Sequence, residues 1–274
     1  MIVDPHTHTS IGSRDSRISP RELLSKALKR GVNVICITDH DNYGGFEEAQ
    51  KIGEKEGIIV IRGLELSTHY GHLLIYGTDI FDICKIDKNI LLEKFSVHRK
   101  EYFTISEVKN IISDSFSSLF EINELIKKVH QYGGAVVLPH PFSRYNGSIT
   151  IRYYLEEYLK SNSLKEVKID KLLSFVEDKD PEYFSILQEI DGIEVLNASC
   201  FGVENNAAFI LADFLNKAPI GASDCHTPEQ VGVYVTEFPK IIKTERDFIS
   251  QLKIGKTKPK LNFVEDNLGS LDLR

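Results

Sequence analysis

Short apolar runs rich in valine and isoleucine recur along the chain, and segments of helical composition follow them. The runs are Ile2–Val3, Val32–Ile37, Ile58–Ile61, Leu73–Tyr76, Ala135–Leu138, Ile193–Leu196 and Pro219–Ala222. Strands of a parallel sheet are covered on both faces, so their sequences are continuously apolar. Alternation of such strands with helices is typical of the α/β class, and about seven units favour a closed barrel over an open sheet.

The first helix has boundary signals at both ends. Ser19 has the short side-chain oxygen that an N-cap needs, and Pro20 suits the first helical position. Gly31 follows the basic pair Lys29 and Arg30, which is typical of a helix end. The sequence therefore predicts a helix between Ser19 and Gly31.

Length and charge restrict the classes of function. Barrels of alternating strand and helix reach 274 residues as one domain, so we expect a single domain over 1–274. The formal net charge is −7, and Lys and Arg are scattered without a long basic run. This argues against a strong electrostatic surface for nucleic acid, whereas a small anionic substrate remains compatible with bound cations.

Compartment signals point to a soluble cytoplasmic protein. No apolar stretch is long enough to span a membrane, and the segment Asp4–His6 comes too early to follow a cleaved signal peptide. The cysteines are far apart and form no CxxC pair, which favours reduced thiols over disulfides or a thiolate zinc site. They are Cys36, Cys84, Cys200 and Cys225. We expect Cys225 to pack in the core.

Histidines and carboxylates follow the apolar runs. These residues are His6, His8, Asp39, His40, Glu65, His140, Asp224 and His226. The carboxyl ends of parallel barrel strands meet at one face, where loops build active sites, so we expect these side chains to converge on one pocket. Imidazole and carboxylate are ligands of Zn, Mn and Fe, and the pattern predicts a multinuclear metal site.

Four short motifs carry a family resemblance. They are His6-Thr7-His8-Thr9, Thr38-Asp39-His40-Asp41, His140-Pro141 and Ser223-Asp224-Cys225-His226. With these motifs the chain resembles the PHP (polymerase and histidinol phosphatase) family of metal-dependent phosphoesterases. The resemblance implies a distorted (β/α)7 TIM-like barrel, and it is interrupted at about 84–130 and 145–190, where we expect insertions.

The resemblance also implies two to three divalent transition-metal ions, Mn, Fe or Zn, bound by three ligand sets. The first set is His6, His8, Glu65 and Asp224. The second is Glu65, His72 and His140, so that Glu65 bridges two ions. The third is Asp15, His40 and His226. Ser16 stands where many members have glycine, which makes Asp15 the weakest point of the third set.

The charges of such a centre favour phosphate as the substrate. Three divalent ions bring about +6, while Asp15, Glu65, Asp224 and one hydroxide bring about −4, and the remainder matches a phosphate monoester better than an amide. Bound metal lowers the pKa of water from ~15.7 towards ~7 and supplies hydroxide for attack on phosphorus. We expect Glu65 and Asp224 to be catalytic, with Asp224 a candidate proton acceptor.

Other side chains are candidates for contacts around the centre. Arg144 follows His140 closely and could clamp phosphate oxygens, with Arg17 a weaker candidate. Asn197 ends an apolar run and could contact substrate. His69 competes with His72 as a ligand, although the run after His72 favours His72. We expect Asp41 to position His40.

The stretch 145–190 is predicted to be a helical excursion from the barrel. It combines charged residues with tyrosines at helical spacing. One of these tyrosines could stack on a substrate base as part of a lid. The alternative, which we favour, is that most of them pack the excursion against the barrel. They are Tyr153, Tyr154, Tyr158 and Tyr183.

The expected function is hydrolysis of a small phosphorylated metabolite, a nucleotide or sugar phosphate, as a mono- or diester. Three alternatives remain. A histidinol-phosphate phosphatase would use the same metals, and a single-strand nucleic-acid exonuclease would need a basic or aromatic groove. A non-catalytic PHP module would lack ligands, yet all nine positions are filled.

Overall fold

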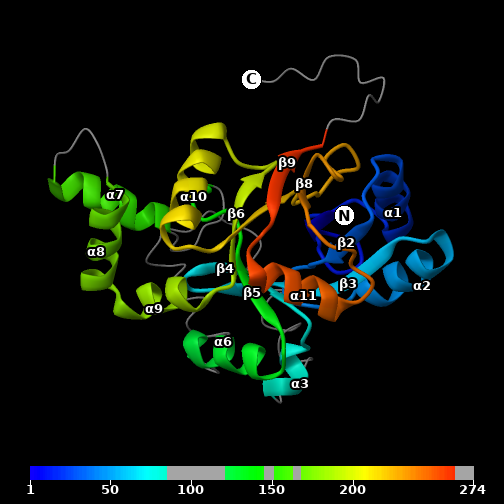
Figure 1. The fold of residues 1–274 in the computed structure, drawn as a ribbon, viewed down its shortest axis with the longest axis horizontal. Coiled ribbons are helices and arrows are strands. Elements are labelled where there is room, and N and C mark those ends of the chain that lie inside the picture. Colours follow the sequence, from blue (N-terminus) through cyan, green and yellow to red (C-terminus); the bar gives the residue numbers. More distant parts are fainter. Residues whose placement is uncertain (85–120, 145–150, 163–167, 263–274) are drawn as a thin grey trace.

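A nearly closed, barrel-shaped sheet forms the centre of the computed structural model, which describes residues 1–84, 121–144, 151–162 and 168–262 (Figure 1). The strands are β1 (Ile2–Thr7), β2 (Val34–Ile37), β3 (Ile59–Thr68), β4 (Gly71–Tyr76), β5 (Ala135–Leu138), β6 (Gly192–Asn197), β7 (Ala218–Ala222), β8 (Tyr234–Glu237) and β9 (Lys258–Leu261). They are ordered β7-β6-β5-β4-β3-β2-β1-β8-β9. A parallel bridge between Thr7 and Cys225 brings the end of β7 back to β1, which nearly closes the sheet.

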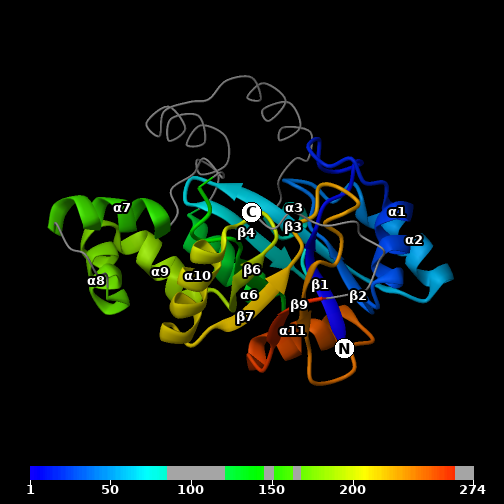
Figure 2. The ribbon, with the colours of Figure 1, turned by 90° about the horizontal axis from the view of Figure 1, so that it is seen from above.

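Helices flank the sheet. They are α1 (Pro20–Lys29), α2 (Phe46–Glu56), α3 (Ile80–Cys84), α6 (Ile122–Gln131), α7 (Ile151–Asn162), α8 (Ile169–Lys179), α9 (Pro181–Glu189), α10 (Gly202–Phe214) and α11 (Glu245–Ile254). Figure 2 shows α1 and α2 on one side of the molecule, and α7 and α8 on the opposite side. The predicted α/β barrel with a helical excursion is therefore confirmed.

All seven apolar runs are strands, but strict alternation of strand and helix is wrong at one place. Strands β3 and β4 form an antiparallel hairpin, and β4 is also antiparallel to β5. The hairpin is possible because β3 continues well beyond Ile61, as far as Thr68. Glu65 therefore lies within a strand, whereas the sequence placed it after one.

Strands β8 and β9 were not predicted. They extend the sheet as an antiparallel pair beyond β1. Strand β9 has the sequence Lys-Pro-Lys-Leu, and charged residues and proline are typical of an edge strand. Such a strand lacks the apolar run on which the prediction relied.

The first helix begins where the sequence predicts. Ser19 is the N-cap and accepts a hydrogen bond from the backbone N of Glu22, while Pro20 occupies the first turn. Gly31 has a φ of 69°, a left-handed conformation that glycine adopts at little cost and that ends the helix.

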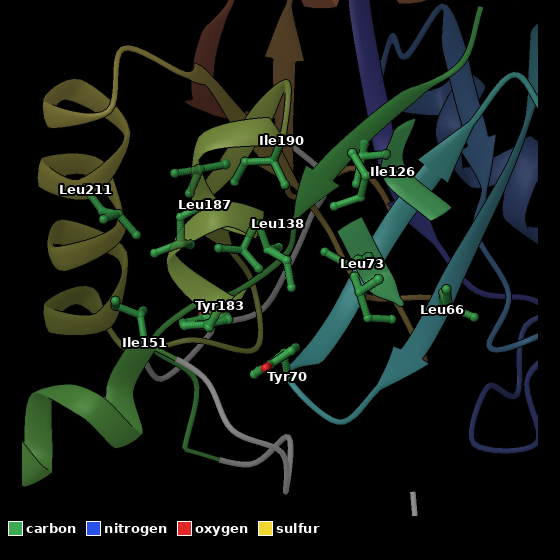
Figure 3. Close-up of a cluster of buried hydrophobic side chains, with 14 of the residues drawn as sticks. Leu66, Tyr70, Leu73, Ile126, Leu138, Ile151, Tyr183, Leu187, Ile190 and Leu211 are labelled. Atoms are coloured by element: carbon green, nitrogen blue, oxygen red, sulfur yellow. The ribbon is translucent and has the colours of Figure 1, made fainter. Parts of the chain in front are cut away.

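The described helices of the excursion, α7 to α9, pack against the barrel. Helices α8 and α9 share one apolar core with β3, β4, β5 and β6, and Figure 3 shows Tyr183 and Tyr70 within it. Tyr154, Tyr158 and Tyr183 are all buried. The packing alternative for these tyrosines is therefore confirmed, while the insertion expected at about 84–130 falls mostly on 85–120, outside the described residues.

Two predictions from composition can be compared with the structure. All four cysteines have free thiols, and Cys225 is buried in an apolar cluster with Val231 and Val235. Within the described part of the chain, no helix has both the length and the apolar character that crossing a membrane requires.

Candidate metal centre

The end of strand β1 positions the first two histidines. Successive side chains of a strand point to opposite faces, so His6 and His8 point to the same side. Both side chains are fully buried, and their Nε2 atoms lie only 3.0 Å apart. Two imidazole nitrogens at this distance need a proton or a cation between them.

The carboxylate of Glu65 stands at the middle of the group. Its Oε2 atom lies 3.2 Å from His6 Nε2 and 3.1 Å from His8 Nε2. His40 Nδ1 lies 3.1 Å from the same oxygen. Although Glu65 is buried, Oε2 takes part in no hydrogen bond of acceptable geometry, because all three nitrogens approach it out of line.

The second oxygen of Glu65 faces two further histidines. His72 Nδ1 lies 2.7 Å from Glu65 Oε1, and His140 Nε2 lies 3.0 Å from it. His72 is brought there by the β3–β4 hairpin, in which it pairs with Ser67. His69, the competing histidine, packs its ring on Tyr70 at 4.0 Å instead, so the geometry favours His72.

Asp224 completes the buried part of the centre. It follows β7 with a φ of 47°, and its Oδ1 atom lies 3.1 Å from His8 Nε2 and 3.4 Å from His6 Nε2. The preceding Ser223 donates from both its backbone N and its hydroxyl to Asp4. This anchor fixes the strained turn that presents Asp224 to the centre.

Asp15 lies at the open edge. Its Oδ2 atom is 3.5 Å from His40 Nε2 and 3.6 Å from His226 Nε2. The Asp15 side chain is 46% exposed, whereas Glu65 is buried. The centre therefore has a closed inner part and an edge that solvent and substrate can reach.

The sequence-predicted residues group in space, although not wholly in the predicted sets. His6, His8, Glu65 and Asp224 offer ligand atoms within 4.8 Å of one another, as in the first set. Three further groups differ from the predicted second and third sets. They are His8, His40 and His226; His40, Glu65 and His72; and His6, His140 and Glu194. The roles of the nine residues as ligands stay a prediction.

Hydrogen bonds on the outer side of three rings suit metal binding. His6 Nδ1 lies 3.2 Å from a carboxylate oxygen of Glu194, and His226 Nδ1 lies 3.0 Å from the carbonyl of Asp224. Both oxygens can only accept, so each Nδ1 carries the proton. A metal ion that displaced the proton from Nε2 would leave a neutral ring whose Nε2 lone pair points into the centre, as in a metal-binding histidine.

His8 is fixed in the same way through a short relay. The Ser13 hydroxyl donates to Asp39 Oδ1 at 2.9 Å, so it must accept from His8 Nδ1, which lies 3.0 Å away. Asp39 also accepts from the backbone N of Thr9 at 2.6 Å. Thus Asp39, which the sequence placed near the centre, orients His8 from behind.

The electrostatics of the centre attract positive charge. Burial alone raises the pKa of Glu65, but His72, His40 and His6 outweigh burial and hold it well below its usual range. Burial likewise opposes the low pKa of Asp224, which interaction with His6 and His8 dominates. Without a metal, protons on the histidines must balance these carboxylates, and a divalent cation would replace those protons.

The histidines respond in the opposite direction. Burial lowers the pKa of His8, yet its hydrogen bond to Asp224 and the nearby charge of Glu65 outweigh burial and raise the pKa to about 9. The pKa of His6 is also raised against the effect of burial, chiefly by Asp224 and Glu65. The donor set and its charge therefore fit divalent metal ions.

Glu194 is the functional residue that sequence reasoning missed. The sequence indicated only a glutamate within an apolar run that could pair with a basic residue. The structure buries it, with Oε1 beside His6 Nδ1 and Oε2 accepting from the backbone N of His140 at 2.8 Å. Its position in the strand, one residue after Ile193, was the available signal, because alternation points it into the barrel.

Three predicted substrate contacts lie in different surroundings. Arg144 stacks over Phe201 at 4.8 Å, and its Nε donates to Glu204 at 3.1 Å. Arg17 is exposed, and its backbone N donates to the carbonyl of His226. These two contacts with substrate stay predictions.

Asn197 is fully buried. Its Nδ2 donates to Glu194 Oε2 at 2.9 Å and to Asp224 Oδ2 at 3.1 Å. Both amide protons therefore orient carboxylates, and the predicted substrate contact of Asn197 stays a prediction. The Asp41 carboxylate accepts from the backbone N and the hydroxyl of Ser67, and its expected role in positioning His40 also stays a prediction.

Family comparison covers the same residues. A sequence model of the PHP domain matches residues 4–160, which is more than half of the chain. A second model, described as PHP-associated, matches residues 202–257. Together the two matches include all nine predicted ligands.

Two curated proteins share part of the sequence. The chain is 39% identical over 67 residues to a 5'-3' exoribonuclease of Haemophilus influenzae, covering 24% of each protein. It is 31% identical over 81 residues to a 3',5'-nucleoside bisphosphate phosphatase of Chromobacterium violaceum, covering 28% of each. The matched parts thus span about a quarter of the length of these relatives.

A solved structure shares the fold. A two-domain protein from Bacteroides vulgatus that contains a PHP-like metal-dependent phosphoesterase superposes with a TM-score of 0.55 at 16% identity. The superposition covers 96% of this chain and 65% of that protein. At this level of identity the similarity concerns the fold alone.

Proposed function

Because this chain belongs to the PHP domain family, we propose that it is a metal-dependent phosphoesterase that hydrolyses a small phosphorylated metabolite. One observation carries the proposal: polar groups behind His6, His8 and His226 face their Nδ1 atoms, which leaves three Nε2 atoms beside Glu65, Asp224 and Asp15 as the atoms that can bind metal. A histidine that served only packing would not need this arrangement.

The residues that would hold the ions are the nine predicted ligands, with Glu65 shared between sets because both of its oxygens face histidines. When bound, divalent ions supply Lewis acidity and lower the pKa of water at neutral pH. Glu194, Asn197 and Asp39 keep the ligands oriented. The expected number is two to three ions of Mn, Fe or Zn per chain.

Asp224 is the candidate for moving a proton. One of its oxygens is held by Asn197 Nδ2, while the other faces the histidine pair. A carboxylate held in this way keeps one fixed orientation towards an attacking water. Because its pKa is low, Asp224 is a weak base. We therefore assign it the role of a transient proton acceptor that passes the proton on.

The exposed side of the centre gives a small anionic substrate access to it. Asp15, His40 and His226 are partly exposed there, so a phosphoryl group can reach the ions from solvent. The net charge of −7 gives a long nucleic acid little electrostatic attraction. The similarity to a 3',5'-nucleoside bisphosphate phosphatase supports nucleotide phosphates as the first substrates to test.

The similarity to a 5'-3' exoribonuclease supports a second candidate, removal of nucleotides from one end of a single-stranded nucleic acid. The two candidates differ in the length of substrate that is accepted. Mononucleotide bisphosphates suffice for the first, whereas the second requires turnover of oligonucleotides from one end.

A substrate screen with a matched pair of variants tests the proposal. The metal-supplemented protein is assayed for phosphate release on phosphorylated metabolites, and for shortening of single-stranded oligonucleotides. Asp224→Asn should reduce turnover of any accepted substrate by roughly 1000-fold, since it removes the charge at the centre but keeps the shape. Asp170→Asn makes the same change on exposed helix α8 and should retain activity.

Two outcomes would contradict the proposal. Full turnover by the folded Asp224→Asn protein would remove this residue from the mechanism. An inert wild-type protein that binds two or three ions yet releases no phosphate from mono- or diesters would instead favour a binding module.

A further inference from the structure

Helix α10 exposes an unusual row of apolar side chains. Val203, Ala207, Ile210 and Phe214 follow one another at spacings of four, three and four residues, which places them on one face of the helix. Val203 is 69% exposed, Ile210 57% and Phe214 50%, while Ala207 is partly buried. We call these four residues the α10 stripe.

The opposite face of α10 already forms part of the core. Ala208, Leu211 and Ala212 are buried, and the helix packs along β6, with Leu211 pointing inward in Figure 3. A surface helix ordinarily turns a polar face to solvent. A helix that is apolar on both faces is typical of one covered on both sides.

The exposed area is large enough to matter. Phe209 is also half exposed, but the turn of about 100° per residue places it about 120° around the helix from the stripe. The stripe alone amounts to roughly 350 Å² of apolar surface, within the range of the largest patches that monomers expose. A stable dimer buries about 800 Å² on each partner, so the stripe would supply a little under half.

We propose that the α10 stripe is the contact between two copies of this chain, related by a two-fold axis with their α10 helices antiparallel. The spacing supports a partner of the same sequence, because reversal about the middle of the stripe superposes it on itself. Val203 then lies opposite Phe214 of the second copy, and Ala207 lies opposite Ile210. Each pair sets a smaller side chain against a larger one, so that bulky groups enter spaces in the partner.

The charges of α10 fit the same arrangement. The helix contains no lysine or arginine, and Asp213 is its exposed acidic residue near the carboxyl end. Antiparallel pairing brings Asp213 to the amino end of the other α10, opposite Glu204, whose buried carboxylate is already paired with Arg144 and Arg152. Arg144, which is 45% exposed and stacks over Phe201, lies at that same end.

Sedimentation of the full chain with bound metal tests the contact. From about 1 to about 100 µM, a range suited to an interface of this size, the wild type should change from monomer to dimer. Ile210→Glu should weaken the dimer by roughly 100-fold, because it places two like charges in an apolar contact. Ile254→Glu, a matched change at an exposed isoleucine of α11, should dimerise as the wild type does.

Cross-linking tests the antiparallel register. With Cys84 and Cys200 changed to serine, Val203→Cys and Phe214→Cys proteins are mixed and treated with a short bifunctional maleimide. The mixture should cross-link at least about tenfold more than either variant alone, since the two positions face each other only across the two-fold axis. A wild type that stays monomeric throughout the concentration range, or an Ile210→Glu protein that dimerises normally, would overturn the proposal.

Discussion

Glu194 shows how much of the candidate centre depends on a residue outside the nine predicted ligands. Its carboxylate stands behind His6 and holds the backbone of His140, and Asn197 fixes it in turn. Residues in this position set the ring orientation of a ligand and raise its basicity. The organisation of the centre therefore depends on the residues that orient the ligands as well as on the nine predicted ligands.

Two substitutions at Glu194 separate charge from hydrogen bonding. Glu194→Ala removes the acceptor of the His6 Nδ1 proton, so metal affinity should fall roughly 10- to 100-fold. Glu194→Gln keeps an acceptor and should lose less. Metal titration by calorimetry measures both, with Glu177→Gln on the exposed face of α8 as the control. Equal affinity of the alanine variant and the wild type would show that Glu194 does not orient His6.

The sequence predicted which ligands converge better than it predicted the residues that orient them. His6, His40 and Asp224 were predictable because parallel strands bring their carboxyl ends to one face of a barrel. Glu194 and Asn197 lie on one such strand, but which group each would bind depends on the register between β6 and β7. That register is a property of packing, and no local pattern in the chain specifies it.

The β3–β4 hairpin links the excursion to the centre. Tyr70, at its turn, donates to Glu182 Oε2 at 3.0 Å and to Asp180 Oδ1 at 3.2 Å. Tyr154, from α7, donates to Asp180 Oδ2 at 2.6 Å. The hairpin carries His72 two residues after Tyr70, so the excursion holds one side of the centre in place.

Replacing either tyrosine tests this link. Tyr70→Phe removes the bonds between hairpin and excursion, so it should lower the free energy of unfolding by roughly 1 to 3 kcal/mol. It should also weaken metal binding, because His72 becomes less well positioned. Tyr154→Phe removes a similar bond inside the excursion and should destabilise without changing metal affinity. Urea unfolding and metal titration of both variants test these expectations. A Tyr70→Phe protein that binds metal as tightly as the wild type would show that Tyr70 has only a structural role.

Elements were predictable where one signal dominated. The seven central strands are largely buried and each contains a short apolar run, so the sequence shows them directly. The β3–β4 hairpin was not predicted, because only a few residues separate the apolar residues of β3 from those of β4. A short helix between two strands would give the same pattern. Strands β8 and β9 are short and lie towards the edge of the sheet, where polar residues are tolerated.

At the scale of the molecule, the centre joins segments that are distant along the chain. His6 and Asp224 are separated by more than two hundred residues, yet their side chains lie 3.4 Å apart. Only the folded chain brings these ligands together, so an ion that binds the folded state must stabilise it against the unfolded one. The buried carboxylates and histidines, which repel their own kind without a metal, strengthen this dependence.

Removal of metal should therefore lower the melting temperature. One ion at about 100 times its Kd contributes about 2.7 kcal/mol, which for a chain of this size corresponds to a decrease of roughly 5 to 10 °C. Calorimetric scans with a chelator, and then with excess manganese or zinc, measure the loss and its recovery. Glu65→Gln removes the carboxylate shared by the first two ligand sets, so the chelator should lower its melting temperature by less than it lowers that of the wild type. A wild-type melting temperature that ignores the chelator, in protein shown to have released its ions, would contradict the linkage between the centre and the fold.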